Sequence, residues 1–142
     1  CSISENTGKG NGVGFWNGPN AVTYLYDCVI AKNSSTGVGA IYNYEITAGY
    51  GTPSLYMVNC EVSGNTNGSY GALYNRDGNA VLVNCTVHGN SAKTGAGVFC
   101  YGSNGIMTMI SCTVTGNIGT FAGEKMFLKD GSKVLGSDEY KK

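Results

Sequence analysis

A frame of fifteen positions that begins with cysteine recurs five times and constrains the fold more than any other feature. The frames begin at Cys1, Cys28, Cys60, Cys85 and Cys112, which are 27, 32, 25 and 27 residues apart. Isoleucine or valine stands two positions after each cysteine, asparagine five after, and an aromatic residue fourteen after in the first four frames. All variation in length falls after the aromatic position, as in a solenoid whose fixed strands alternate with variable loops.

The periodicity within each frame is that of a β-strand. Cys85 and Val87 face one way, while Thr86 and His88 face the other. Gly-Asn follows in three frames, and because both residues tolerate positive φ, the pair predicts a corner. We therefore predict an all-β parallel solenoid of about five coils of 25–32 residues, each with three short strands.

Stacking of the coils explains the repeated residues. Equivalent positions in neighbouring coils lie about 4.8 Å apart, so inward aliphatic residues form a continuous apolar column. Asparagines can hydrogen-bond along their own column where the backbone ladder bends. The predicted structural columns are Cys1, Cys28, Cys60, Cys85 and Cys112; Asn6, Asn33, Asn65, Asn90 and Asn117; and, before the cysteines, Asn59 and Asn84.

The six cysteines raise the question of disulfides. Stacked cysteines would have parallel Cα–Cβ vectors, which fit disulfide dihedral angles poorly, so we favour a column of thiols over a set of bridges. Cys100 lies outside the column, at the position that Asn43 and Asn75 occupy in their frames.

The pattern N-C-x-[IV]-x-G-N, followed by G-A-[ILV]-[YF], resembles a known repeat. It is similar to the right-handed parallel β-helix repeats of pectin-lyase-like surface proteins, especially those of polymorphic outer-membrane proteins and adhesin-like passengers. Residues 38–41, 70–73 and 95–98 carry the second half of the pattern. The resemblance covers roughly residues 1–127. It implies a right-handed, single-stranded parallel β-helix and an adhesin-like stalk or passenger.

The ends of the chain differ from its middle. We assign residues 1–127 to solenoid coils and residues 128–142 to a C-terminal cap or tail, since nine of the eighteen charged residues lie from Glu124 onward. The chain begins on a column cysteine, so we expect it to be a fragment of a longer protein. It contains no apolar run of transmembrane length.

Charge favours an extracellular or cell-surface setting. The formal net charge is zero and only 13% of residues are charged, so nothing suggests that the chain binds nucleic acid.

The aspartates Asp27, Asp77, Asp130 and Asp138 are dispersed along the sequence, whereas glycosidases need paired carboxylates. We predict no catalytic residue, metal or cofactor. The alternative is a fragment of a β-helix polysaccharide lyase or hydrolase.

The aromatic column is the candidate binding surface. It alternates with branched aliphatic residues that we expect to face inward, which would leave the aromatic rings outward. The predicted strip, able to stack on sugar rings or contact another surface protein, comprises Tyr42, Tyr44, Tyr74, Phe99 and Tyr101. The alternative is that these rings pack beneath loops. A further hypothesis is a self-assembling filament subunit that pairs through strand edges at open coil ends.

Overall fold

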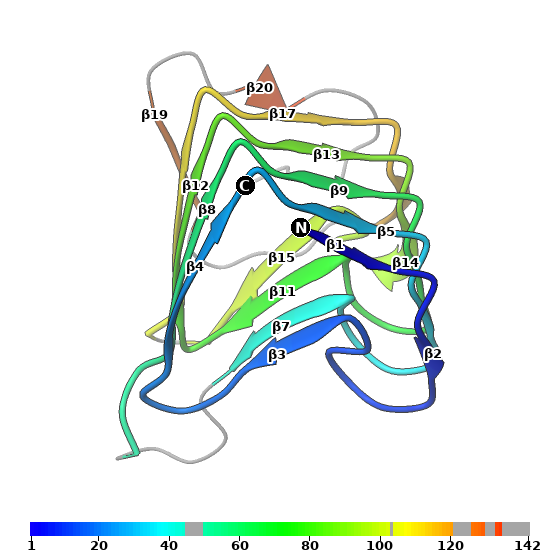
Figure 1. Cartoon of the computed structure of the whole chain (residues 1–142), viewed down its shortest axis with the longest axis horizontal. Helices are drawn as coiled ribbons and strands as arrows, with labels where there is room; N and C mark the ends of the chain where they lie inside the picture. Colours follow the sequence, from blue (N-terminus) through cyan, green and yellow to red (C-terminus); the bar gives the residue numbers. More distant parts are fainter. Residues whose placement is uncertain (45–49, 103, 121–125, 130–132, 135–142) are drawn as a thin grey trace.

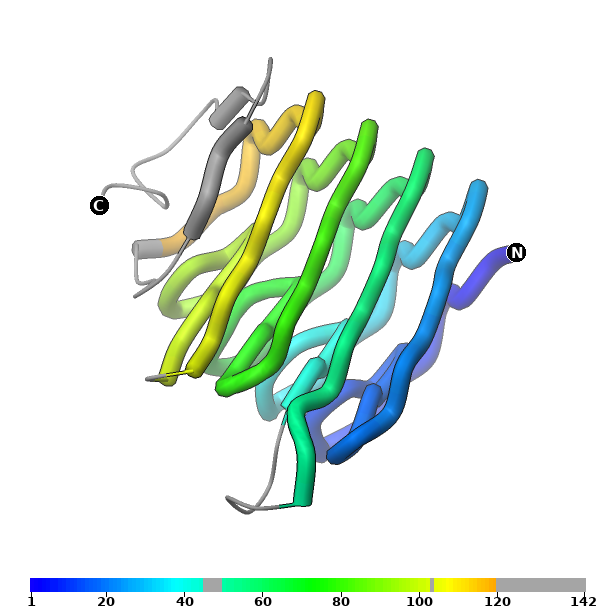
Figure 2. Tube along the Cα trace, turned by 90° about the vertical axis from the view of Figure 1, so that its left-hand side faces the viewer, coloured from blue at the N-terminus to red at the C-terminus, as the bar shows by residue number. Residues whose placement is uncertain are grey.

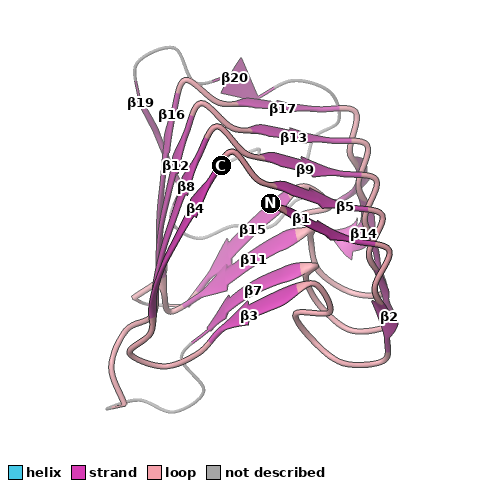
Figure 3. Ribbon diagram, in the orientation of Figure 1, coloured by secondary structure: helices cyan, strands magenta, loops and turns pink. Residues whose placement is uncertain are grey.

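Every regular element that the structure describes is a β-strand. The computed structural model describes residues 1–44, 50–102, 104–120, 126–129 and 133–134 (Figure 1). The strands form four sheets, A to D, and the paired strands in the described part of the chain run parallel. The described chain passes through the sheets in the order A, B, C, D and then returns to A (Figure 3).

The strands of each sheet come from successive coils. Sheet A contains β1 (Ser2–Ser4), β5 (Val29–Ala31), β9 (Glu61–Ser63), β13 (Thr86–His88), β17 (Thr113–Thr115) and β20 (Lys133–Val134). Sheet B contains β2 (Thr7–Gly8), β6 (Ser34–Ser35), β10 (Thr66–Asn67), β14 (Ser91–Thr94) and β18 (Ile118–Thr120). Sheet C contains β3 (Phe15–Asn17), β7 (Ile41–Tyr44), β11 (Leu73–Arg76) and β15 (Val98–Tyr101). Sheet D contains β4 (Val22–Tyr26), β8 (Ser54–Val58), β12 (Asn79–Val83), β16 (Ile106–Ile110) and β19 (Met126–Lys129).

The architecture is therefore all-β with stacked parallel sheets, as in a parallel β solenoid (Figure 2). No helix occurs in the part of the chain that the structure describes, and so no helix there could cross a membrane. β19 and β20 extend sheets D and A in parallel. The rest of the predicted C-terminal cap or tail, residues 130–132 and 135–142, lies outside the described residues.

The prediction of three strands in each coil is wrong, because the coils from Cys1 to Ile110 each hold four. The extra corner separates sheet D from sheet A just before the column cysteine. The residues there, Asp27, Asn59, Asn84 and Ser111, have φ of 54°, 54°, 51° and 54°. A left-handed residue turns the chain abruptly, and here no glycine marks the corner in the sequence.

The interior is filled by one aliphatic and thiol cluster. Its largest fully buried side chains include Ile30 and Val62 from sheet A, Leu73 from sheet C, and Met57 and Leu82 from sheet D. The column thiols donate to backbone carbonyls of sheet D; for example, Cys85 Sγ lies 3.4 Å from the oxygens of Met57 and Val83. The six cysteines form no disulfide.

The register in the first coil differs from the ungapped frame by one residue. The frame aligns Phe15 with Tyr42, whereas in the structure Phe15 pairs with Ile41 and Trp16 with Tyr42. The offset arises in the glycine-rich turn between Gly8, which still pairs with Ser35, and Phe15. It places Phe15 against the core and Trp16 on the outer side of sheet C.

Candidate functional site

The aromatic column lies on the outer side of sheet C, as expected, but three of its rings are covered. Tyr42, Tyr74 and Phe99 are only 5%, 3% and 4% exposed and form a cluster separate from the core. The expectation of an exposed strip is therefore wrong for these three rings, because neighbouring aromatic side chains cover them. Tyr101 is 41% exposed and Tyr44 is partly exposed. The binding role of the five residues stays a prediction.

Stacking along the solenoid holds these rings together. Ring centroids are 5.2 Å apart for Tyr42 and Tyr74, and 5.0 Å apart for Tyr74 and Phe99. Tyr70 packs against both Tyr74 and Phe99, at 5.3 and 4.6 Å. Burial raises the pKa of the Tyr42 phenol, and it raises the pKa of Tyr74 to about 12. We call this surface the aromatic face; it comprises Trp16, Tyr42, Tyr44, Tyr70, Tyr74, Phe99 and Tyr101.

Arg76 is the cation of the aromatic face. Its register partners in the neighbouring coils are Tyr44 and Tyr101, and its guanidinium carbon lies 5.0 and 5.4 Å from their ring centroids. Cation–π contacts of this kind hold the guanidinium in place. Its Nε is buried without a hydrogen-bond acceptor, and within the described residues no carboxylate forms an ion pair with it. The guanidinium charge is therefore not neutralised by a carboxylate of the described residues, and it can bind an anionic group of a ligand.

Two hollows adjoin these rings. One of about 290 Å³ is lined by Asn11, Trp16, Tyr42 and Tyr44. The other, of about 190 Å³, is lined by Tyr70, Tyr74, Arg76, Phe99 and Tyr101. The first belongs to the first and second coils and the second to the third and fourth, so roughly 10 Å separates them along the solenoid axis. Each combines aromatic surface with at least one polar side chain.

Three residues on or beside the aromatic face escaped the sequence prediction: Trp16, Arg76, and Tyr70, which precedes the strand. Trp16 was missed because the ungapped frame assigned Phe15 to the column instead. Arg76 was not part of the predicted strip, although the frame places it sixteen positions after Cys60, where the neighbouring frames hold Tyr44 and Tyr101. The shared frame position of Tyr44, Arg76 and Tyr101 could therefore have predicted a guanidinium between two aromatic rings.

Exposed tyrosines also lie on the outer side of sheet D. Tyr24 and Tyr26 are each 57% exposed, with ring planes 1° apart. Tyr56 in the next coil stacks on Tyr24 with centroids 4.9 Å apart. These rings form a flat platform on a different face of the solenoid from sheet C, so they provide a matched control for the aromatic face.

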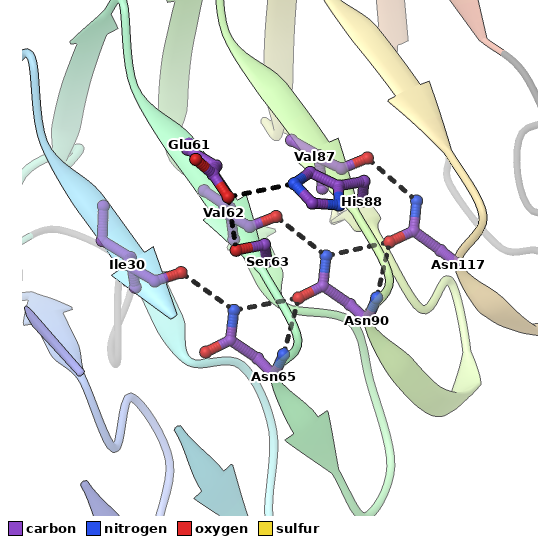
Figure 4. A network of polar contacts seen from close by, with 9 residues as sticks. All are labelled: Ile30, Glu61, Val62, Ser63, Asn65, Val87, His88, Asn90 and Asn117. Atoms are coloured by element: carbon purple, nitrogen blue, oxygen red, sulfur yellow. Dashed lines mark hydrogen bonds and ion pairs between the residues drawn. The ribbon is translucent and has the colours of Figure 1, made fainter. Parts of the chain in front are cut away.

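A polar groove of about 430 Å³ runs along the corner between sheets D and A, and Asp27, Asn59, Glu61, Asn84 and His88 contribute polar side chains to it. Glu61 Oε1 accepts a hydrogen bond from Ser63 Oγ at 2.7 Å and lies 3.0 Å from His88 Nε2 (Figure 4). The hydrogen bonds from Ser63 and His88 lower the pKa of Glu61. Both members of the Glu61–His88 pair are more than 40% exposed at the side chain.

The chemistry of this groove does not match a nucleophilic triad. In such a triad histidine accepts the serine proton and the carboxylate orients histidine. Here the serine donates to the carboxylate, so histidine does not activate it. A glycosidase acid needs a raised pKa, whereas that of Glu61 is lowered.

Comparison of the chain with protein-family models, with curated proteins and with solved structures gave no match.

Proposed function

We propose that this chain is a non-enzymatic glycan-binding module of an extracellular or cell-surface protein, with the aromatic face as its binding surface. The observation that carries the proposal is Arg76 between the rings of Tyr44 and Tyr101, beside a hollow lined by three further aromatic side chains. The apolar faces of sugar rings stack on aromatic side chains. A guanidinium binds carboxylates and sulfates through two parallel hydrogen bonds.

The two hollows suggest how the ligand lies. They are aligned along the solenoid axis, and the continuous stack from Trp16 to Phe99 connects them. An extended oligosaccharide running along this axis would contact Trp16 at one end and Tyr101 at the other. Arg76 favours a glycan with acidic groups over a neutral one.

The finer identity of the fold is part of the same proposal. We interpret the stacked sheets as a right-handed parallel β-helix with coils starting at Cys1, Cys28, Cys60, Cys85 and Cys112. The repeat pattern resembles that of pectin-lyase-like proteins and adhesin-like passengers. This supports a stalk or passenger, with a glycan or another surface protein as partner.

Substitution of the exposed rings tests the proposal. Trp16→Ala and Tyr101→Ala should each weaken binding of an acidic hexasaccharide at least tenfold, equivalent to about 1.4 kcal/mol, in isothermal titration calorimetry. Arg76→Gln should remove the preference for the acidic hexasaccharide over its neutral analogue. Tyr24→Ala, which removes a ring from sheet D that is 57% exposed, against 50% for Trp16 and 41% for Tyr101, serves as the matched control.

Two results would contradict the proposal that the aromatic face binds the glycan. Unchanged affinity in Trp16→Ala, Tyr101→Ala and Arg76→Gln, with all three variants folded by circular dichroism, would exclude the aromatic face. Equal losses in Tyr24→Ala and Tyr101→Ala would show non-specific contact with exposed rings. Tyr74→Ala is unsuitable because its 3% exposure makes it part of the packing.

Two alternatives remain proposals. A polysaccharide lyase or hydrolase fragment would use the groove that contains Asp27, Glu61 and His88. Release of reducing or unsaturated ends from an acidic glycan, abolished by Glu61→Gln, would favour it. A filament subunit would associate through the strand edges of its end coils. Light scattering that rises with protein concentration would favour that second alternative.

A further inference from the structure

A second polar groove follows the short strands of sheet B, and no residue of the aromatic face lines it. Its volume is about 470 Å³. Six of its described lining residues carry hydroxyls, namely Thr7, Ser34, Ser35, Thr36, Thr66 and Ser69. Asn67 and Lys93 add an amide and an ammonium group, and no described lining residue carries a carboxylate. We call it the sheet B groove.

Asn67 is the unusual member of this lining. It is only 5% exposed, yet neither its side-chain nitrogen nor its side-chain oxygen has a hydrogen-bond partner. The main chain beside it is anchored, because Thr66 N donates to Asn33 O at 2.9 Å and Ser91 N donates to Asn65 O at 2.9 Å. The unpaired amide therefore lies on a fixed strand at the wall of a groove.

The equivalent residue in the neighbouring coil shows that pairing is achievable at this position. Ser35 is the register partner of Asn67, and it is likewise buried. Ser35 Oγ donates to Gly10 O and accepts from Gly37 N at 2.9 Å. The core asparagines are also paired; Asn65, two residues before Asn67, is bonded through both side-chain atoms. A buried polar group without a partner destabilises the fold, so a ligand that pairs with it gains affinity.

The chemistry of an amide restricts the ligand. The side chain of asparagine presents one acceptor and one donor group side by side, and another amide complements both. A carboxylate or phosphate would satisfy only the nitrogen. The surrounding threonine and serine hydroxyls, each both donor and acceptor, match the hydroxyls of a sugar.

We propose that the sheet B groove binds a saccharide that carries an acetamido group, with the Asn67 amide pairing with the acetamido amide. The threonine and serine hydroxyls of the groove hydrogen-bond to the sugar hydroxyls. The proposal is independent of the aromatic face, because no residue of that face lines this groove.

The test compares two trisaccharides that differ in the acetamido group alone. The ¹⁵N-labelled chain is titrated with N,N′,N″-triacetylchitotriose, called chitotriose below, and with cellotriose, and the Asn67 side-chain NH₂ resonance is followed by NMR. Chitotriose should shift this resonance with an affinity at least tenfold above that of cellotriose. A blocked alanine tripeptide provides the amide without the hydroxyls and should not bind.

Variants then separate a binding role from a structural one. Asn67→Ser reproduces Ser35 and should lower chitotriose affinity at least tenfold, while the melting temperature is unchanged or rises because an unpaired amide is removed. Thr66→Val removes an exposed hydroxyl and should weaken binding without affecting folding. Trp16→Ala and Tyr101→Ala should leave the chitotriose response at Asn67 intact, so this proposal and the proposed function can fail separately.

Three results would overturn the proposal. The first is equal binding of chitotriose and cellotriose, or no shift of the Asn67 resonance. The second is comparable binding of the blocked tripeptide, which would indicate a peptide site instead. The third is a melting temperature several degrees lower in Asn67→Ser, which would show that the amide has a structural partner.

Discussion

Asn65 binds Asn90 of the next coil through both its side chain and its main chain. Its Nδ2 donates to Asn90 Oδ1 at 2.9 Å, and its backbone N–H donates to the same oxygen at 2.9 Å. The Nδ2 of Asn65 also donates to Ile30 O at 3.1 Å, in the preceding coil (Figure 4). Asn33 and Asn90 each make the same three bonds to the equivalent residues of the coils on either side. Each corner asparagine thereby ties its own coil to both neighbours.

Replacing Asn90 with aspartate should strongly destabilise the fold. A carboxylate keeps the shape but cannot donate to Val62 O or to Asn117 Oδ1, which lie 3.1 and 2.8 Å away. Breaking such a buried network costs about 3–5 kcal/mol. Urea unfolding at pH 7 measures the loss, and protonation of the carboxyl at lower pH should restore part of it.

Asn84→Asp provides the matched control for this prediction. Asn84 also belongs to a column and donates to Asn59 Oδ1 at 2.8 Å, but it is exposed to solvent. Its left-handed φ of 51° suits aspartate as well as asparagine. We expect a change within about 0.5 kcal/mol. Equal losses for Asn84→Asp and Asn90→Asp would contradict the role assigned to burial.

Stability should fall at alkaline pH because of Tyr42 and Tyr74. Burial raises the pKa of both phenols in the folded chain, that of Tyr74 to about 12, whereas an unfolded tyrosine ionises at about pH 10. The stabilising contribution is complete below the unfolded pKa and is lost as pH rises toward the folded values. Thermal melts between pH 9 and 12 should show the decline, which Tyr74→Phe should reduce. An unchanged slope in Tyr74→Phe would count against this assignment.

From the Glu61–His88 pair we expect the stability of the fold to depend on pH in the acid range as well. Hydrogen bonds from Ser63 and His88 hold the pKa of Glu61 below its usual value, so its contribution is complete above the unfolded carboxyl pKa of about 4.3. That contribution disappears as pH falls through the lowered folded pKa. The effect should be small because both side chains are exposed. Melting temperatures from pH 6 to pH 2.5 should decline less steeply in Glu61→Gln, and a parallel decline in the variant would argue against the pair.

Thiol reactivity should separate Cys1 from the other five cysteines. Cys1 is exposed, whereas the other five are buried. Burial raises the pKa of the Cys60 thiol, which makes the reactive thiolate scarce. An aromatic disulfide reagent should modify one thiol of the reduced native chain and six in denaturant. Rapid modification of more than one native thiol would contradict this prediction.

The repeat predicted the stacking of strands but not the shape of each coil. Equivalent asparagines recur because an amide oxygen accepts from one coil while the amide nitrogen donates to the next. The positions before each cysteine were assigned to a structural column, but the fourth strand of each coil was missed, since Asn59 and Ser111 adopt positive φ without a glycine to signal a further turn. The one-residue offset before Phe15 was missed too, because a change of turn length leaves both flanking patterns intact.

The candidate site was predicted only in outline. Alternation along the strand correctly separated inward Leu73 from outward Tyr74, but burial of Tyr74 depends on Tyr70, which lies before the strand. The Glu61–His88 contact is diagonal between coils, because the register partner of Glu61 is Thr86. Contacts of this kind depend on side-chain conformations, which cannot be derived from the alignment of the repeats.

The asparagine ladders give the solenoid a direction. In both ladders, from Asn6 to Asn117 and from Asn17 to Asn75, every bond between two asparagine side chains runs from the amide nitrogen of one coil to the carbonyl oxygen of the next. The amide dipoles therefore align and reinforce one another, as in a chain of hydrogen bonds. Any coil added to this stack, from the same chain or from another, can continue the ladders only head to tail. Two like ends would place oxygen against oxygen or nitrogen against nitrogen.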